Sequence, residues 1–227
     1  MTGRVSGLWV YPVKSMRGQS LDVADIETRG IVGDRLYAVR DEAGKFGSGK
    51  NTRRFARMEG LARWSARRHD ERLEVRPPDG EWLDASNAAT ADLLTAQVGR
   101  PVQITREADV SHFDAAPLHL LTSADLAALA QYSGARAACE TFRPNILIES
   151  ETRSADWIGQ RLTLGDIELE IIAPTERCLM VNVTPTGDRG PDFLRAIAQR
   201  MDECFGVYAN VVQVGRITLR DMVAARK

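Results

Sequence analysis

Cysteine is scarce in this chain of 227 residues. Its three cysteines, Cys139, Cys178 and Cys204, are odd in number and widely separated, and none belongs to a Cys-x-x-Cys pair. This pattern disfavours both a disulfide framework and a four-cysteine zinc site, because each needs paired or closely spaced thiols. Three scattered thiols also cannot hold an iron–sulfur cluster. Each cysteine therefore has to be judged by its own surroundings.

The chain also lacks an excess of charge of either sign and any long apolar run. Thirty basic residues against thirty-one acidic ones leave a net charge of -1, so no overall field draws in nucleic acid or an acidic membrane. No apolar stretch approaches the roughly 18 residues of a spanning helix, and the N-terminal residues lack the apolar core of a signal peptide. We therefore expect a cytoplasmic protein that binds neither nucleic acid nor membranes.

Strand-like patterns dominate the first third of the sequence. β-branched and aromatic residues punctuated by glycines are typical of short antiparallel strands. The segments with this pattern are residues 4–13, 19–28, 34–42 and 72–85. Residues 41–46 are typical of a hairpin turn, with Gly44 placed where the chain can take a positive φ.

Helical patterns begin in the middle of the chain. Residues 87–99 and 122–134 each combine a capping residue, apolar positions at helical spacing and a terminating glycine, which predicts two helices. A third helix is predicted over residues 191–206, and strands are predicted over residues 144–150, 162–174 and 211–223. This order of elements predicts a β-rich α+β fold.

The segment GKFGSGKN, residues 44–51, resembles a nucleotide-binding P-loop but has Asn51 where a P-loop has the hydroxyl that holds Mg²⁺. A P-loop also lies between a parallel strand and a helix, whereas the neighbouring patterns are antiparallel hairpins. We interpret the segment as a hairpin followed by a basic loop. The cations Lys50, Arg53 and Arg54 of this loop either bind an anion or form a solvated surface.

Cys178 is the cysteine best placed for chemistry. It follows Arg177 and the strand-like segment 162–174, so its thiol is expected at a strand end and not in a core. A neighbouring arginine favours the thiolate, which is the form that ligates metals or attacks electrophiles. On residue chemistry alone, a packed and inert cysteine is the commoner outcome. Cys139 and Cys204 are interpreted as buried, inert thiols, the latter on the third predicted helix.

Two histidines, His112 and His119, flank the segment FDAAPL. A seven-residue gap that contains a proline does not place them on one helix face, so they do not form a typical metal pair. We interpret them as polar residues of a loop and a strand, one of them near the mouth of a substrate site.

Four motifs spread along nearly the whole chain carry a family resemblance. They are YPVKSMRG at residues 11–18, GDRLYAV at 33–39, TFRPNILI at 141–148 and ERCLMVNVTPTG at 176–187. Together they resemble the MOSC family, the molybdenum cofactor sulfurase C-terminal domain proteins, which include the mitochondrial amidoxime-reducing component and related bacterial reductases. The resemblance implies an antiparallel β-barrel with peripheral helices in a core domain at residues 117–227. It also implies a smaller N-terminal β subdomain at residues 1–116, whose strands within residues 1–40 pack with the core.

The resemblance further implies that the protein binds the molybdenum cofactor, with Cys178 as the molybdenum ligand. A soft thiolate suits a metal that also carries dithiolene sulfurs. The residues that carry over as cofactor contacts are Lys14, Ser15, Arg35, Thr122, Ser123, Arg143, Asn145 and Arg177. Lysine and arginine supply charge-assisted donors to phosphate, and asparagine can both donate and accept at a pterin edge. Taken singly, the same side chains are more typical of solvated strand ends, surface ion pairs and turns than of cofactor contacts.

The implied activity is the reduction of N-hydroxylated or N-oxide substrates by a monomer that receives electrons from a separate protein, because no ferredoxin-like cysteine cluster is present. The segment after Cys178 lacks the Asp-Pro-Asp-Thr-Gly form of the amidoxime-reducing enzymes, so the substrate stays open. Pyridoxal phosphate binding also accompanies the family, and we assign no residue to it. Two alternatives remain: a sulfur-transfer protein with a persulfide on Cys178, and a carrier that delivers the cofactor to other enzymes.

Overall fold

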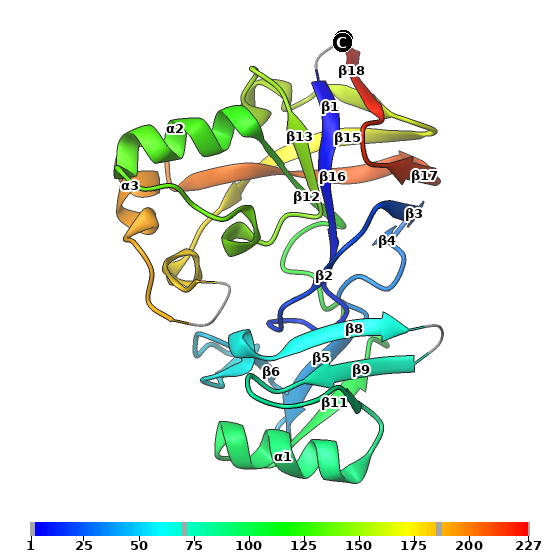
Figure 1. Ribbon diagram of the computed structural model, residues 1–227, viewed down its shortest axis with the longest axis vertical. Coiled ribbons are helices and arrows are strands. Elements are labelled where there is room, and N and C mark those ends of the chain that lie inside the picture. The colour runs from blue at the N-terminus through cyan, green and yellow to red at the C-terminus, as the bar shows by residue number, and fades with distance from the viewer. Residues whose placement is uncertain (1–2, 70–71, 185–187, 227) are drawn as a thin grey trace.

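The computed structural model describes residues 3–69, 72–184 and 188–226. The last three residues of the fourth motif, 185–187, lie outside this range. Figure 1 shows two β-rich parts that follow one another along the long axis of the molecule, with helices α2 and α3 beside one part and α1 beside the other. None of the helices in the described ranges is long and apolar enough to cross a membrane.

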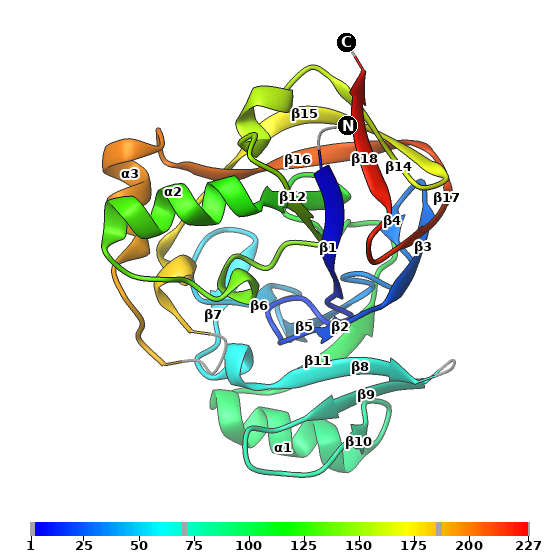
Figure 2. The same cartoon turned by 45° about the horizontal axis from the view of Figure 1, so that its top comes forward.

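Within the described residues, a closed barrel of seven strands forms the larger part. Its strands, in spatial order, are β13 (Ile146–Glu149), β12 (Leu118–Thr122), β16 (Cys204–Gln213), β15 (Ile167–Glu176), β14 (Arg161–Leu164), β18 (Met222–Arg226) and β1 (Gly3–Val10). Pairing of β1 with β13 closes the ring, which Figure 2 shows from a turned view. The predicted β-barrel is confirmed, although β12 and β13 run parallel while the other neighbours are antiparallel.

Alternation of side chains along the strands builds the barrel core. In β15 the side chains of Ile167, Leu169 and Ile171 are fully buried, whereas the glutamates between them are not. Because successive residues of a strand point to opposite faces, this pattern fixes which face of the strand turns inward. The apolar faces of the other barrel strands join the same core cluster.

Two helices pack beside the barrel, α2 (Ser123–Ser133) and α3 (Phe193–Arg200). The first confirms the predicted helix over residues 122–134 and ends at Gly134, which has a φ of 70°. The predicted helix over residues 191–206 is wrong at its C-terminal end. The chain takes positive φ values at Asp202 and Glu203, and Cys204 begins β16 instead of lying on the helix.

In the smaller part, the described residues form two sheets and the α-helix α1. One sheet has the order β11 (Val102–Arg106), β5 (Tyr37–Asp41), β6 (Phe46–Ser48), β7 (Phe55–Arg57). The other has the order β10 (Leu83–Asp84), β9 (Arg72–Arg76), β8 (Ser65–His69). Helix α1 (Ala88–Val98) confirms the predicted helix over residues 87–99, with Asn87 as its N-cap and Gly99 as its C-cap. These elements share a second core cluster that surrounds Trp64.

Strands from the first forty residues join the C-terminal half of the chain. In addition to β1, the short strand β2 (Gln19–Ser20) extends the barrel sheet. Strands β3 (Val23–Glu27) and β4 (Gly30–Ile31) form a three-stranded sheet with β17 (Gly215–Thr218). Four 3-10 turns complete the described elements: η1 (Leu61–Arg63), η2 (Cys139–Phe142), η3 (Ser154–Trp157) and η4 (Leu179–Asn182).

The P-loop-like segment is a hairpin and a loop, as interpreted from the sequence. Strands β5 and β6 are antiparallel, and the turn between them contains Gly44 with a φ of 75°. Residues 49–54 connect β6 to β7, and no helix begins at Lys50 within the described residues. One detail differs from the expectation of antiparallel surroundings, because β6 and β7 pair in parallel.

Candidate functional site

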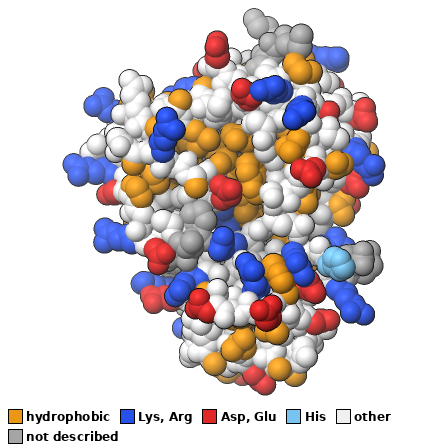
Figure 3. Space-filling model, viewed as in Figure 1, with side chains coloured by type: hydrophobic (Ala, Val, Ile, Leu, Met, Phe, Trp, Pro, Cys, Tyr) orange, Lys and Arg blue, Asp and Glu red, His pale blue; other side chains and the backbone are white. Residues whose placement is uncertain are grey.

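A cleft of about 760 Å³ lies where the barrel part meets the smaller part. It is lined by η2 and η4 beside the barrel, by the segment after β1, and by the loop between β6 and β7. Among the described residues, seven cationic side chains and three acidic ones line it: Lys14, Arg17, Arg35, Lys50, Arg54, Arg143 and Arg177, with Asp114, Glu140 and Glu176. The whole chain has a net charge of -1, so positive charge is concentrated at the cleft. Figure 3 shows Lys and Arg side chains gathered across the middle of the molecule.

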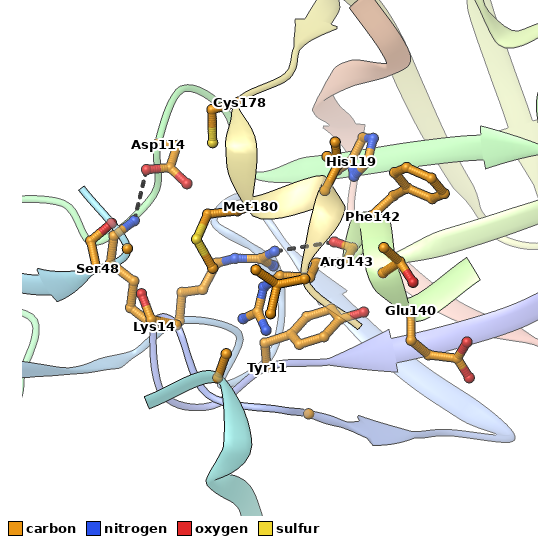
Figure 4. Close-up of a pocket in the computed structure, with 18 of the residues that line it drawn as sticks. Tyr11, Lys14, Ser48, Asp114, His119, Glu140, Phe142, Arg143, Cys178 and Met180 are labelled. Atoms are coloured by element: carbon orange, nitrogen blue, oxygen red, sulfur yellow. Dashed lines mark hydrogen bonds and ion pairs between the residues drawn. The ribbon is translucent and has the colours of Figure 1, made fainter. Parts of the chain in front are cut away.

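Cys178 lines this cleft as an exposed, free thiol. It follows the end of β15 and stands immediately before η4, where the amide of Val181 donates to its carbonyl oxygen. The prediction that the thiol lies at a strand end and not in a core is confirmed. Figure 4 shows Cys178 and Asp114 toward one end of the drawn site, and Glu140 and Phe142 toward the other.

The side chain of Arg177 is held inside the protein beside the cleft. Its Nη2 donates to the carbonyl oxygen of Phe142 at 2.8 Å, and its guanidinium lies 5.6 Å from the ring of that residue. Its Nε is buried and has no hydrogen-bond partner among the described residues. Burial lowers the pKa of Arg177, so an anion in the cleft would stabilise the charged form of this side chain.

Lys14 and Ser15 come from the loop after β1. Lys14 is buried, and its Nζ donates to the carbonyl oxygen of His112 at 2.7 Å and to Asp114 Oδ1 at 2.9 Å. Burial lowers the pKa of Lys14, and Asp114 opposes that effect. Ser15 has a φ of 69°, and its hydroxyl donates to the carbonyl oxygen of Gly47 at 2.8 Å. Both residues line the cleft.

Arg35 and Arg143 lie together on Tyr11. Their guanidinium carbons are 4.8 Å and 4.3 Å from the centre of its ring. Arg35 is paired with the buried carboxylate of Asp34, whereas Arg143 Nη1 donates to the carbonyl oxygen of Met16 at 2.6 Å. Burial, and then the neighbouring charge of Arg35, lower the pKa of Arg143 to about 10. Two cations held this closely form a site that favours an anion.

Asn145 lines the same cleft, but protein partners already occupy its amide. Its Oδ1 accepts from the amide of His119 at 3.1 Å and from Arg35 Nη1 at 3.3 Å, and its Nδ2 donates to the carbonyl oxygen of Trp9 at 3.3 Å. The side chain is 1% exposed. Asn145 therefore ties β1, β12 and Arg35 together under the cleft.

Thr122 and Ser123 are not brought into the cleft with the other predicted residues. Thr122 is the N-cap of α2, where its hydroxyl accepts from the amide of Asp125 and the Asp125 carboxylate accepts from the amide of Thr122. The hydroxyl of Ser123 donates to the carbonyl oxygen of Ser150 at 2.9 Å. Both hydroxyls thus serve local structure at the start of the helix.

The basic loop lines the cleft through Lys50 and Arg54, while Arg53 is absent from its described lining. Arg54 Nη2 donates to the carbonyl oxygens of Ser111 and Phe113, and its buried Nε has no partner among the described residues. The interpretation of this loop as a solvated surface therefore does not account for all of it, because Lys50 and Arg54 line the cleft.

Several cleft residues were not identified from the sequence. Asp114 lies in the segment between the two histidines, and no spacing or motif points to it. Met180 follows Cys178 by two residues and reaches the basic loop, where a Cβ added to Gly49 would lie 2.1 Å from the Met180 sulfur. Tyr208 reaches the cleft from β16, a strand whose first half was not predicted. Residue chemistry alone gives no signal for such long-range neighbours.

One histidine lies in a loop and the other on a strand, as interpreted from the sequence. His112 lies in a loop, where its Nδ1 is 3.1 Å from the carbonyl oxygen of Arg35 and its Nε2 is 3.2 Å from Arg40 Nη2. His119 is on β12 and lines the cleft, with its ring 6.0 Å from that of Tyr208. Burial lowers the pKa of each ring, so both are neutral near pH 7.

The other two cysteines are half-buried free thiols. Burial raises the pKa of Cys139 to about 12 and also raises the pKa of Cys204. Both pKa shifts disfavour the thiolate and therefore reactivity. The prediction that both thiols are buried is therefore met only in part, because each is half-buried.

Comparison with known proteins assigns the chain to a family. The model of the MOSC domain matches residues 107–224, and that of the MOSC N-terminal beta barrel domain matches residues 2–117. The chain belongs to the MOSC domain family. The resemblance carried by the four motifs is therefore confirmed.

Relatives of this MOSC protein include mitochondrial amidoxime reducing component 2 of Bos taurus, which is 24% identical over 97% of this chain and 82% of its own length. Molybdenum cofactor sulfurase of Caenorhabditis elegans is 25% identical over 57% of this chain and 18% of its own length. Among solved structures, the YUAD protein from Bacillus subtilis superposes with a TM-score of 0.57 at 14% identity, covering 99% of this chain and 96% of that one. This last similarity shows a shared fold.

Proposed function

We propose that this MOSC protein binds the molybdenum cofactor in the cleft and reduces N-hydroxylated or N-oxide substrates. The observation that carries the proposal is the exposed thiol of Cys178 in the wall of a cleft lined by seven cations, in a chain whose net charge is -1. The names of the relatives, an amidoxime-reducing component and a molybdenum cofactor sulfurase, support the same chemistry.

The residues of the cleft fit this cofactor. Its phosphate-bearing tail needs cationic donors, and Arg35 and Arg143 lie together on Tyr11. Among the described residues, the carboxylate of Asp34 is the only one paired to them. The pterin presents several heteroatoms, and the buried Nε of Arg177 is a donor with no partner among the described residues. A buried donor left without a partner costs about 1–3 kcal/mol, so a ligand that accepts from it gains stability.

In this proposal, Cys178 supplies the thiolate ligand, and the cofactor's polar groups are held by Lys14, Ser15, Arg35, Arg143 and Arg177. Asn145 acts indirectly, since it fixes Arg35 through a 3.3 Å contact. Lys14 and Arg35 are already held by Asp114 and Asp34 before any ligand arrives. Donors that are oriented in advance need little reorganisation when they bind an anion.

When bound, the cofactor supplies the two-electron redox chemistry. The overall conversion takes R–NHOH, two electrons and two protons to R–NH₂ and water, so the N–O bond is broken and nitrogen is reduced. A separate electron-donor protein supplies the electrons, because three separated cysteines cannot build an iron–sulfur cluster. The chain's own contribution is to bind the cofactor, orient it against the substrate and surround both with fixed cations.

The test is to purify the protein from a host that makes the molybdenum cofactor, and to measure molybdenum, pterin and turnover of benzamidoxime with a chemical reductant. Near-stoichiometric molybdenum and pterin with turnover support the reductase. Cofactor without turnover supports a carrier, and metal-free protein with a persulfide on Cys178 supports sulfur transfer. Absence of both cofactor and persulfide would reject the proposal and its two alternatives.

A further inference from the structure

We infer that Lys50 determines substrate specificity at this cleft by selecting N-oxygenated substrates that carry a carboxylate. The inference rests on the proposed function and deepens it, because it names the class of substrate. It follows from a difference among the cations of the cleft: most are held by protein partners, whereas the ammonium of Lys50 is not.

Five of the seven cleft cations have hydrogen-bond or ion-pair partners in the protein. Lys14 pairs with Asp114, and Arg35 pairs with Asp34. The other three, Arg54, Arg143 and Arg177, each donate to backbone carbonyl oxygens. The ammonium of Lys50 has neither a hydrogen bond nor an ion pair within residues 3–69, 72–184 and 188–226; its described contact is the ring of Phe55, 4.9 Å away.

Phe55 places Lys50 close to the interior of the site. The Nζ of Lys14 lies 5.4 Å from the centre of the same ring, so the two ammonium groups share one aromatic platform. Asp114 is bonded directly to Lys14 and acts on Lys50 only as a nearby charge. The exposure of the two also differs, because Lys14 is buried while Lys50 is exposed. A ligand that enters from solvent can reach Lys50 without displacing a protein group.

The backbone beside Lys50 adjoins the segment that carries the thiol. Gly49 is so close to Met180 that a Cβ would lie 2.1 Å from the methionine sulfur, and Met180 follows Cys178 by two residues. In the proposed function, the N–O group would approach the metal that Cys178 would hold, and the rest of the substrate would lie beside this junction. Arg17, whose side chain also lacks a described partner, has its backbone paired with Ser65 of β8, and its amide donates to the carbonyl oxygen of Trp64.

A carboxylate suits this cation for physical reasons. An ammonium on a flexible four-carbon chain can reach a carboxylate over a range of positions, and the resulting charge-assisted hydrogen bond is stronger than a neutral one. Because Lys50 is exposed, the gain is modest and screened by salt. We expect removal of the charge to weaken binding of a carboxylated substrate up to about fivefold at low ionic strength.

The experiment compares two substrates, benzamidoxime and 4-carboxybenzamidoxime, on cofactor-loaded protein at low and high salt. The variants are Lys50→Ala and the matched control Lys45→Ala, which removes the same charge from the preceding β5–β6 hairpin. The Nζ of Lys45 donates to the carbonyl oxygen of Thr52, and Lys45 is not among the described lining residues. Calorimetric binding of the products, benzamidine and 4-carboxybenzamidine, gives a readout that needs no turnover. Molybdenum content is measured for every variant.

We expect Lys50→Ala to lower the ratio of kcat/KM for the carboxylated over the uncharged substrate up to about fivefold, through KM, and to weaken 4-carboxybenzamidine binding by the same factor. Lys45→Ala should leave the ratio unchanged, and high salt should reduce the effect. An unchanged ratio in Lys50→Ala overturns the inference, and so does a loss of molybdenum, which would assign Lys50 to the cofactor. If the loaded protein turns over neither substrate, the proposed function fails, and the calorimetric comparison alone decides the role of Lys50.

Discussion

Lys14 and Asp114 form an ion pair in the cleft, with 2.9 Å between Nζ and Oδ1. The side chain of the lysine is 7% exposed and that of the aspartate 63% exposed, so the pair joins a buried cation to an accessible carboxylate. An anionic ligand that reaches Lys14 therefore competes with a group that can turn into solvent.

Replacing Lys14 should lower cofactor content. Lys14→Ala removes a buried donor whose hydrogen bonds to charged partners are worth about 1.5–3 kcal/mol, which corresponds to roughly ten- to hundredfold weaker binding. Molybdenum per protein, measured after expression with limiting cofactor, should fall below half of the unmodified value. Lys50→Ala is the matched control and should keep its molybdenum. Equal losses in both variants would place the basic loop at the cofactor and contradict the separation of roles.

Replacing Thr122 should affect stability and not cofactor content. Thr122→Ala removes the N-cap of α2, which costs about 1 kcal/mol of unfolding free energy, whereas Thr122→Ser keeps a hydroxyl and should cost less. Urea denaturation measures the first effect and elemental analysis the second. A loss of molybdenum in Thr122→Ala without a loss of stability would show that this hydroxyl contacts the cofactor, as the family resemblance implies.

The buried ring of His112 should make stability depend on pH. Burial lowers its pKa from 6.5 to about 4 in the folded protein. Between these values the unfolded chain binds the proton and the folded chain does not, so the free energy of unfolding should decrease as the pH falls from 6.5 toward 4. Denaturant titrations across this window should show a smaller decrease in His112→Gln. An identical decrease in both proteins would mean that other groups cause it.

The helices were the elements that the sequence predicted best. For α1 and α2, the capping residues Asn87 and Thr122 and the terminating glycines are local signals, and the observed bounds lie within one residue of the predicted ones. The third helix was extended into β16 because residues 201–206 continue a helical pattern. The helix instead ends at Arg200, and the positive φ values at Asp202 and Glu203 then turn the chain into β16.

Long-range pairings could not be predicted from local patterns. The closure of the barrel joins Arg4 to Glu149 and Leu8 to Ile146, and nothing in either segment specifies the other. The cleft also depends on long-range contacts, because four distant motifs supply its residues Lys14, Arg35, Arg143 and Cys178. Their common location was implied only by the family resemblance. Asp114 lies outside these motifs, and Met180 lies inside the fourth without an assigned role, so only the fold reveals that both line the cleft.

The most direct test of the account is the molybdenum content of Cys178→Ala, purified from a host that makes the cofactor. Cys139→Ala and Cys204→Ala are matched controls, each of which should cost only about 1 kcal/mol of stability. The account predicts near-stoichiometric molybdenum in the unmodified protein and both controls, with loss of molybdenum and of N-reduction in Cys178→Ala. Full molybdenum and full activity in Cys178→Ala, or their loss in either control alone, would contradict it.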